Sequence, residues 1–393
     1  MKKITIMYDF WKELGGLERV MAFQANKLLR ENNVEMLFSY VSEKEKEKVA
    51  KELGLDKRAG ISQIGKFNSE FIQLALSMLF PSRINNKKTD LIISHSFMCS
   101  RMAYTKKKHD GTKYMVMMHH PPNFLYSRNI RWANNVPRFF AYILGLIFGA
   151  LLKRADKTAI KNAEIVIVNS EYTRKRAREI YGIDPVVIYP PISKVFKPMD
   201  KNNAERITKR FGISGKFVMM HGRMIRDKRP DWAIEAFSKI KNEDLNLLFS
   251  GTIEEEKRIR ALVNNLGLKE RVKIIGRVSE EELVALYSSA ECFIMPAPKE
   301  DFGLTSVEAM ACGCPVVAWN DNAGPNETVV NGVTGILAKP YDLDEMAKSI
   351  EYIIKSGLKQ KNKAKIINSV RRFSEKDAGI KMLLLVRGIS RKS

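Results

Sequence analysis

Short apolar runs alternate with longer amphipathic stretches along nearly the whole chain. Residues 4–7, 91–94 and 164–168 are rich in Ile, Val, Leu and Met and have the length of buried strands. Between such runs lie stretches with helical periodicity, such as 19–30. This alternation of strands and helices predicts an α/β fold with doubly wound sheets.

The same pattern restarts near the middle of the chain. An apolar run at 186–192 contains Pro190-Pro191, a linker signal, and a new strand is predicted at 217–223. The length of 393 residues also favours two domains. We expect an N-terminal domain at 1–192, a second domain at 193–372, and a final amphipathic helix with a basic tail at 373–393.

Residues 296–337 form the most distinctive stretch of the sequence. They follow a predicted buried strand at 292–295, and a loop containing Gly303 then leads into a helix. We expect Thr305 or Ser306 to cap this helix, because either hydroxyl can accept a hydrogen bond from a backbone N–H. The unit is therefore a strand, a loop and a helix N-terminus, at the end of the strands where α/β sheets bind ligands.

Two carboxylates frame this helix N-terminus. Glu300 lies in the loop, and Glu308 lies about one turn inside the helix. A helix N-terminus suits a phosphate, whereas carboxylates accept hydrogen bonds from hydroxyls. A sugar nucleotide, in which hydroxyls flank a diphosphate, matches both features. The alternative is that both glutamates are ordinary solvated side chains.

Two other predicted strand ends carry groups suited to a phosphorylated ligand. Gly15 and Gly16 follow the first strand and open a helix, which lets the backbone approach a ligand. Gly222-Arg223 ends the first strand of the second half, and Lys228 follows in the same turn. Arginine as a planar fork and lysine as a point charge can clamp a diphosphate.

A histidine pair marks a further candidate site. His119 and His120 end a strand and are followed by Pro121-Pro122, which makes the turn rigid. A shared metal ion is disfavoured, because adjacent side chains of an extended chain point to opposite sides. His95, at the end of another predicted strand, either lines the cleft or has a structural role.

The central stretch resembles a known family. It contains Glu300-x7-Glu308, then Glu-Ala-Met-Ala-x-Gly-x-Pro-Val and Gly-Pro-x-Glu-Thr, a match over about forty positions. This resembles the retaining GT-B glycosyltransferases of family 4, group 1, nearest in motif to Alg2/Alg11-like and bacterial mannosyltransferases. The resemblance implies two Rossmann-like domains facing across a cleft.

The implied activity is transfer of a hexose, with retention, from GDP-mannose to a hydroxyl of a lipid-linked or other glycan acceptor. In the family, the first glutamate (Glu300) and a histidine (His119) contact the donor sugar, and Glu308 contacts the ribose. Arg223 and Lys228 stabilise the departing diphosphate. Further donor-binding positions are Gly15, Gly16, Gly222, Val278, Phe302, Gly303, Leu304 and Thr305.

The family mechanism needs no covalent nucleophile, because the leaving phosphate takes the acceptor proton. No Asp-x-Asp metal motif lies near the predicted site, so we expect a metal-independent enzyme with no cofactor. One departure is Ala323, where the Alg2-like pattern has glycine.

The charge points to a second kind of partner. The chain has 67 basic and 44 acidic side chains, a net charge of +23, and residues 57–138 hold fourteen basic and three acidic side chains. Such a region attracts anionic lipid, nucleic acid or a phosphorylated substrate, although a soluble basic protein has the same composition. The apolar run 139–152 is too short to span a bilayer comfortably and fits either an interfacial helix or a buried one. We favour peripheral contact with an anionic membrane surface and a lipid-linked acceptor.

The remaining features indicate a cytoplasmic protein. The N-terminus lacks a long apolar region and a cleavage site, so it is interpreted as a strand rather than a signal peptide. The four cysteines have no zinc-site spacing and are expected to be small reduced residues: Cys99, Cys292, Cys312 and Cys314.

Three alternatives compete with this interpretation. A UDP-sugar could replace GDP-mannose within the same fold. A sugar-nucleotide epimerase of this fold should carry further carboxylate and histidine pairs for acid–base chemistry, and the sequence offers none. A nucleic-acid-binding protein would explain the charge but would not need Glu300 or Glu308, so we expect no nucleic acid partner.

Overall fold

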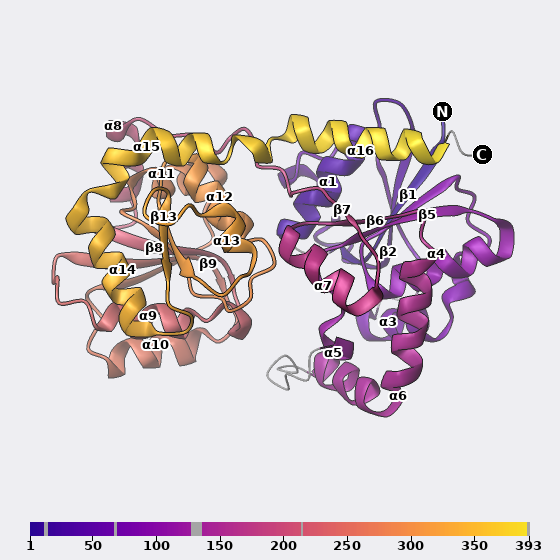
Figure 1. The fold of residues 1–393 in the computed structure, drawn as a ribbon, viewed down its shortest axis with the longest axis horizontal. Coiled ribbons are helices and arrows are strands. Elements are labelled where there is room, and N and C mark those ends of the chain that lie inside the picture. Colours follow the sequence, from indigo (N-terminus) through magenta and orange to yellow (C-terminus); the bar gives the residue numbers. More distant parts are fainter. Residues whose placement is uncertain (12–14, 67–68, 127–135, 214, 391–393) are drawn as a thin grey trace. The chain divides into compact units, whose positions relative to one another are not determined.

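The computed structural model describes residues 1–11, 15–66, 69–126, 136–213 and 215–390. The chain divides into two compact units, one formed by Met1–Pro190 with Lys376–Ser393 and the other by Pro191–Glu375. Each unit contains one parallel sheet with helices packed on it (Figure 1). The predicted α/β fold class, with two Rossmann-like units, is therefore confirmed.

The first unit is built on a seven-stranded sheet with the order β3-β2-β1-β4-β5-β6-β7. Chain order reverses between β1 and β4, which makes their carboxyl ends the switch point at which such sheets bind ligands. The strands are β1 (Lys3–Trp11), β2 (Asn33–Val41), β3 (Gly60–Gln63), β4 (Leu91–Ser94), β5 (Lys113–Met118), β6 (Ile165–Val168) and β7 (Val186–Val187).

Helices cover both faces of this sheet. Helices α1 and α16 share an apolar core with one face, and α4, α6 and α7 share a second core with the other. Strand β5 alternates between the two cores, which explains why its residues are continuously apolar. The helices are α1 (Gly16–Leu28), α2 (Lys46–Glu52), α3 (Glu70–Leu79), α4 (Phe97–Asp110), α5 (Asn123–Tyr126), α6 (Val136–Lys161), α7 (Glu171–Tyr181) and α16 (Glu375–Ser390).

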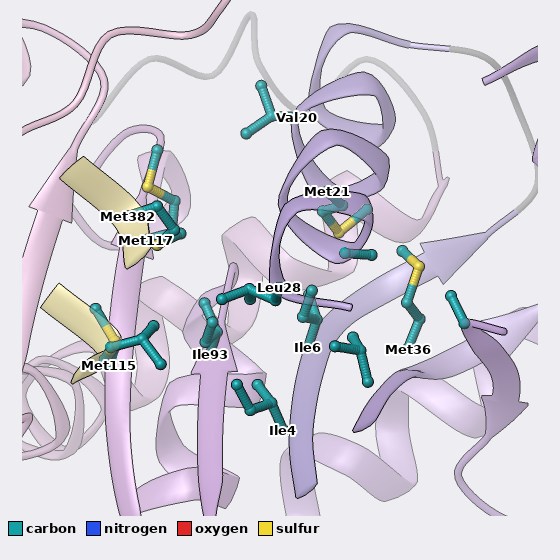
Figure 2. Close-up of a cluster of buried hydrophobic side chains, with 14 of the residues drawn as sticks. Ile4, Ile6, Val20, Met21, Leu28, Met36, Ile93, Met115, Met117 and Met382 are labelled. Atoms are coloured by element: carbon teal, nitrogen blue, oxygen red, sulfur yellow. The ribbon is translucent and has the colours of Figure 1, made fainter. Parts of the chain in front are cut away.

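The last helix, α16, is part of the first unit. Its buried residues Ala378, Met382 and Val386 are spaced by four and therefore lie on one helical face. Figure 2 shows Met382 beside Met117 of β5, and both belong to one buried cluster with Met115. Burial of this stripe attaches the C-terminal helix to the same sheet face as α1.

The second unit has a six-stranded sheet with the order β10-β9-β8-β11-β12-β13, and its switch point lies between β8 and β11. The central strands β11 and β12 are fully buried, as their unbroken apolar sequence predicts. The strands are β8 (Lys216–Met224), β9 (Leu245–Ile253), β10 (Val272–Gly276), β11 (Phe293–Met295), β12 (Val316–Trp319) and β13 (Gly335–Ala338). The helices are α8 (Lys201–Lys209), α9 (Pro230–Ser238), α10 (Glu256–Asn265), α11 (Glu280–Ser289), α12 (Leu304–Ala311), α13 (Gly324–Thr328), α14 (Leu343–Ser356) and α15 (Leu358–Ser369).

The apolar run 139–152 lies within α6. Leu146, Ile147 and Leu151 are 61–66% exposed, whereas Leu152 is buried, so this helix is not buried on all sides. Among the residues that the structure describes, no helix is long and apolar enough to cross a membrane.

We expect Met382→Ala to lower the free energy of unfolding by about 2–5 kcal/mol, because it removes a fully buried side chain and leaves a cavity. The matched control is Leu384→Ala on the same helix: Leu384 is 58% exposed and Met382 is 1% exposed. The control should change stability by no more than about 0.5 kcal/mol. Urea denaturation followed by circular dichroism measures both, and equal losses would contradict the packing of α16.

Candidate functional site

The central motif folds at the switch point of the second sheet. Helix α12 begins at Leu304, and Gly303 precedes it as the cap residue with a left-handed φ of 81°. The expectation that Thr305 or Ser306 caps this helix is therefore wrong, since both lie in its first turn. The reason is that glycine adopts positive φ without steric cost, so the chain turns into the helix earlier. Ser306 Oγ instead donates a hydrogen bond to the Gly303 carbonyl at 2.6 Å.

Glu300 and Lys228 form an ion pair, with 2.5 Å between Lys228 Nζ and Glu300 Oε2. They follow the neighbouring strands β11 and β8, whose carboxyl ends meet at this edge of the sheet. The Glu300 side chain is 15% exposed and that of Lys228 is 38% exposed. Both residues were predicted to bind one ligand, but their contact with each other was not predicted.

Glycines bring the end of β8 close to the start of α12. Gly222 has a φ of 124°, and a Cβ built on it would lie 3.8 Å from Cγ2 of Thr305. On the neighbouring strand, a Cβ on Gly251 would lie 2.2 Å from the Gly222 carbonyl oxygen, so only glycine fits there. Arg223 follows Gly222 and is exposed at this edge.

The other predicted positions differ in what they can offer a ligand. Glu308 is 5% exposed, so the alternative of a solvated helix side chain is wrong for this residue. The Phe302 ring packs edge-on against Phe373 at 5.4 Å, which leaves the backbone of Phe302 as the part available to a ligand. Val278 lies between β10 and α11, and β10 is two positions from β8 in the sheet. Ser279 caps α11 in a capping box with Glu282, for which Ser279 followed by three glutamates is the signal in the sequence.

Asp321 and Tyr341 hold the Glu300 loop and were not predicted from the sequence. The carboxylate of Asp321 accepts hydrogen bonds from the backbone N–H of Lys299 at 2.7 Å and from the Tyr341 hydroxyl at 3.2 Å. The backbone N–H of Gly324 donates to the Glu300 carbonyl at 2.8 Å. Two polar residues after strand β12, Asn320 and Asp321, were the available signal in the sequence.

In the first unit, Gly15 and Gly16 lie at the start of α1, while residues 12–14 of the predicted glycine turn lie outside the described residues. A Cβ on Gly15 would lie 2.4 Å from Glu18 Oε2, so a larger residue at this position would displace the buried Glu18 carboxylate. Glu18 is the last residue of the predicted glycine turn, but its contact with Gly15 was not predicted.

His119 and His95 meet at the ends of the adjacent strands β5 and β4. Their Nε2 and Nδ1 atoms are 3.0 Å apart, and His95 Nε2 lies 2.9 Å from Oε1 of Gln24 on α1. Burial lowers the pKa of His95 well below its usual value and that of His119 to about 3. His120 is exposed, and its Nδ1–H donates to the Pro121 carbonyl. Gln24, which lies inside a predicted amphipathic helix, was missed.

A carboxylic acid lies at the end of β1 in the same unit. Asp9 accepts a hydrogen bond from Ser96 Oγ at 2.7 Å, and burial raises the pKa of Asp9 to about 6. All four cysteines are buried and unpaired. Within the described ranges, no three His, Cys, Asp or Glu side chains lie close enough together to hold a metal ion.

Each half of the chain matches a glycosyltransferase family model. Residues 203–377 match "Glycosyl transferases group 1", and residues 14–194 match "Glycosyltransferase Family 4". The D-inositol 3-phosphate glycosyltransferase of Mycobacterium sp. (strain KMS) is 30% identical over 213 residues, which are 51% of this chain and 47% of that protein. The protein of that name from Mycobacterium tuberculosis (strain F11) is 28% identical over 208 residues, 51% of this chain and 43% of that protein. The chain thus spans about half the length of the curated relatives that it matches.

Solved structures show the same fold over the whole chain. Sucrose-phosphate synthase from Thermosynechococcus elongatus aligns with a TM-score of 0.79 at 19% identity, over 100% of both chains. Anabaena Alr3699/HepE in complex with UDP-glucose aligns with a TM-score of 0.78 at 19% identity, over 99% of this chain and 100% of that one. The fold is therefore that of the GT-B glycosyltransferases. These relatives do not include an Alg2 or Alg11 protein, so that closer kinship stays a hypothesis.

The neutral state of His119 predicts a loss of stability in acid. The unfolded chain takes up a proton at His119 below about pH 6.5, whereas the folded state resists protonation until about pH 3. The contribution of neutral His119 to the free energy of unfolding is therefore complete above pH 6.5 and is lost as the pH falls towards 3. We therefore expect the free-energy difference of unfolding between wild type and His119→Asn to shrink from pH 7 to pH 5, by at most about 1.4 kcal/mol per pH unit.

Denaturant titrations of both proteins at several pH values measure this difference. The raised pKa of Asp9 has the opposite effect, because protonation of Asp9 favours the folded state as the pH falls. Asp9 is present in both proteins, so its contribution cancels in the difference between them. Parallel pH curves for the two proteins would contradict a His119 that stays neutral in the folded state.

Proposed function

We propose that this chain is a glycosyltransferase that moves a hexose from a sugar nucleotide to an acceptor hydroxyl with retention of configuration. The observation that carries this proposal is the Lys228–Glu300 pair beside the N-terminus of α12, at the switch point of the second sheet. Two glycosyltransferase family models, one for each half of the chain, support it.

The diphosphate of the donor is assigned to Arg223, Lys228 and the N-terminus of α12. Each offers positive charge or free N–H groups, and together they stabilise the charge that grows on the departing nucleotide. Lys228 must then exchange the Glu300 carboxylate for a phosphate oxygen. This exchange frees Glu300 to accept hydrogen bonds from hydroxyls of the sugar, so the pair couples diphosphate binding to sugar binding.

The two carboxylates, both largely buried, are assigned to hydroxyls of the donor. The resemblance assigns Glu308 to the ribose hydroxyls and Glu300 to the transferred sugar, and a carboxylate accepts hydrogen bonds from such hydroxyls. The backbone N–H groups of residues 302–305 add neutral donors. In the first unit, the resemblance assigns Gly15, Gly16 and His119 to the donor.

The reaction exchanges two bonds at the anomeric carbon. The bond to the diphosphate oxygen breaks, the acceptor oxygen bonds to the same face, and the leaving phosphate takes the acceptor proton. The residues assigned to the diphosphate can balance its charge without a metal ion, so we propose a metal-independent reaction.

The motif and the structural neighbours favour different donors. His119-x-Pro121 and Gly324-Pro325-x-Glu327 resemble the mannosyltransferases and favour GDP-mannose. HepE, which has the same fold, binds UDP-glucose, and this favours a UDP-hexose. We keep GDP-mannose as the first candidate and UDP-glucose as the second, with a lipid-linked or other glycan as acceptor.

Helix α6 supports contact with an anionic membrane surface, which we place on the cytoplasmic side. Its exposed face carries Leu146, Ile147 and Leu151, and its C-terminal part carries the exposed cations Arg154 and Lys157. Apolar side chains beside cations match an anionic bilayer surface. Such a position would bring the enzyme to a lipid-linked acceptor.

Glu300→Ala should lower sugar transfer by about 100-fold or more, the cost of losing one charged hydrogen-bonding group in an active site. Its stability should change by no more than about 1 kcal/mol, because Lys228 is partly exposed. The assay screens GDP-mannose, UDP-glucose, UDP-N-acetylglucosamine and UDP-galactose for binding and hydrolysis, with and without EDTA.

The matched control is Glu256→Ala, an exposed glutamate at the start of α10. Full activity in Glu300→Ala would contradict the site, and a strict loss of activity in EDTA would contradict metal independence. Binding of a UDP-sugar alone would discard GDP-mannose, and binding of no donor would contradict the proposed function.

For the membrane proposal, a triple variant with Leu146→Ser, Ile147→Ser and Leu151→Ser should bind vesicles of phosphatidylglycerol and phosphatidylcholine at least about 10-fold more weakly. The control replaces Ile380 and Leu384, which are exposed on α16, by serine. Co-sedimentation measures both. Equal binding of the two variants would show that α6 is not the contact surface.

A further inference from the structure

Three polar side chains form one hydrogen-bonded chain at the carboxyl edge of the first sheet. Gln24 Oε1 lies 2.9 Å from His95 Nε2, and His95 Nδ1 lies 3.0 Å from His119 Nε2. The histidines follow the paired strands β4 and β5, and Gln24 comes from α1. Gln24 and His95 are buried, whereas His119 is partly exposed at the end of the chain of hydrogen bonds.

This hydrogen-bonded chain has one direction. The Gln24 carbonyl oxygen can only accept, so the donor to it is the Nε2–H of His95. A neutral imidazole carries a single N–H, so His95 Nδ1 is an acceptor and receives the Nε2–H of His119. Nδ1 of His119 then carries no hydrogen and is left as an acceptor.

Both imidazoles are neutral near pH 7. Burial lowers the pKa of each, and the neighbouring His120 lowers that of His119 further. The other titratable groups around this edge are Asp9 at the end of β1 and Glu18 on α1. Neither carboxylate is a member of the Gln24–His95–His119 chain, which ends on an uncharged amide oxygen.

We propose that Gln24 and His95 are positioning residues that fix the tautomer of His119, so that its Nδ1 accepts a hydrogen bond from a hydroxyl of the donor sugar. This inference rests on the proposed function and adds two residues to it. A fixed acceptor favours a sugar that presents a hydroxyl at this point. A sugar that lacks this hydroxyl is disfavoured, because its binding removes water from Nδ1 of His119 and gives the nitrogen no new hydrogen-bond donor.

The first test measures the tautomers directly. The chain has five histidines, so their imidazole nitrogens can be resolved by long-range ¹H–¹⁵N NMR of the labelled full chain without substrate. We expect His95 and His119 both to carry hydrogen on Nε2 at pH 7 and to stay neutral down to pH 5. A proton on Nδ1 of His119, or an imidazolium at pH 7, would overturn the proposal.

The second test reverses the direction of the chain. In Gln24→Glu, the carboxylate should stabilise an imidazolium at His95, whose Nδ1–H then donates to His119 Nε2. The proton of His119 must then lie on Nδ1, and the acceptor is lost. We expect kcat/KM of this variant to fall at least 10-fold at low pH and to recover as the pH rises through the pKa of His95.

Gln24→Met is the matched control, since it has a similar size but provides neither carbonyl nor charge. It should lower kcat/KM at all pH values without adding a new titration, and the titrations of Asp9 and Glu18 are common to all variants. Melting curves check that each variant is folded. If Gln24→Glu has the pH profile of the wild type, Gln24 is only structural and the proposal fails.

The two tests separate this inference from the proposed function. If NMR finds the expected tautomers but the wild type turns over no donor, the proposed function fails, and the sugar-binding role of His119 fails with it. If the wild type is active but His119 carries its proton on Nδ1, the function stands and the inference alone is overturned.

Discussion

Close backbone contact at the carboxyl edge of the second sheet is the constraint on which its candidate site depends. A Cβ on Gly251 would meet the Gly222 carbonyl at 2.2 Å, and a Cβ on Gly324 would meet the Asp301 carbonyl at 2.5 Å. Because both positions are glycine, the strand ends and the loop can pack together. This packing places Lys228 and Glu300, which are 72 positions apart, within one ion pair.

The two units differ in their electrostatics. The second unit concentrates full charges, those of Lys228, Glu300 and Glu308, beside a helix N-terminus, which suits a diphosphate and its hydroxyls. At its switch point the first unit holds two neutral imidazoles that end on an amide oxygen. A neutral imidazole can accept a hydrogen bond from a hydroxyl and adds no further charge to the site.

Helix α6 has one side buried in the first unit and another side exposed. On its inner side, Asp156 accepts hydrogen bonds from the hydroxyls of Tyr126 and Tyr181, each at 2.8 Å. Burial raises the pKa of Asp156. This interaction fixes α6 against α5 and α7, so the face with Leu146 and Leu151 stays exposed. The apolar residues are thus held outward by a buried polar contact on the opposite side.

The sequence by itself determined the α/β class, the strand–loop–helix order of the central motif and the Ser279 cap, because periodicity and capping depend on residues a few positions apart. It could not determine which residue would cap α12, since two hydroxyls and one glycine competed for that turn. Only the tertiary structure decided that Lys228 pairs with Glu300 and that Gln24 contacts His95. Those partners come from different strands and helices, and their contact depends on strand order and close packing, which no local pattern encodes.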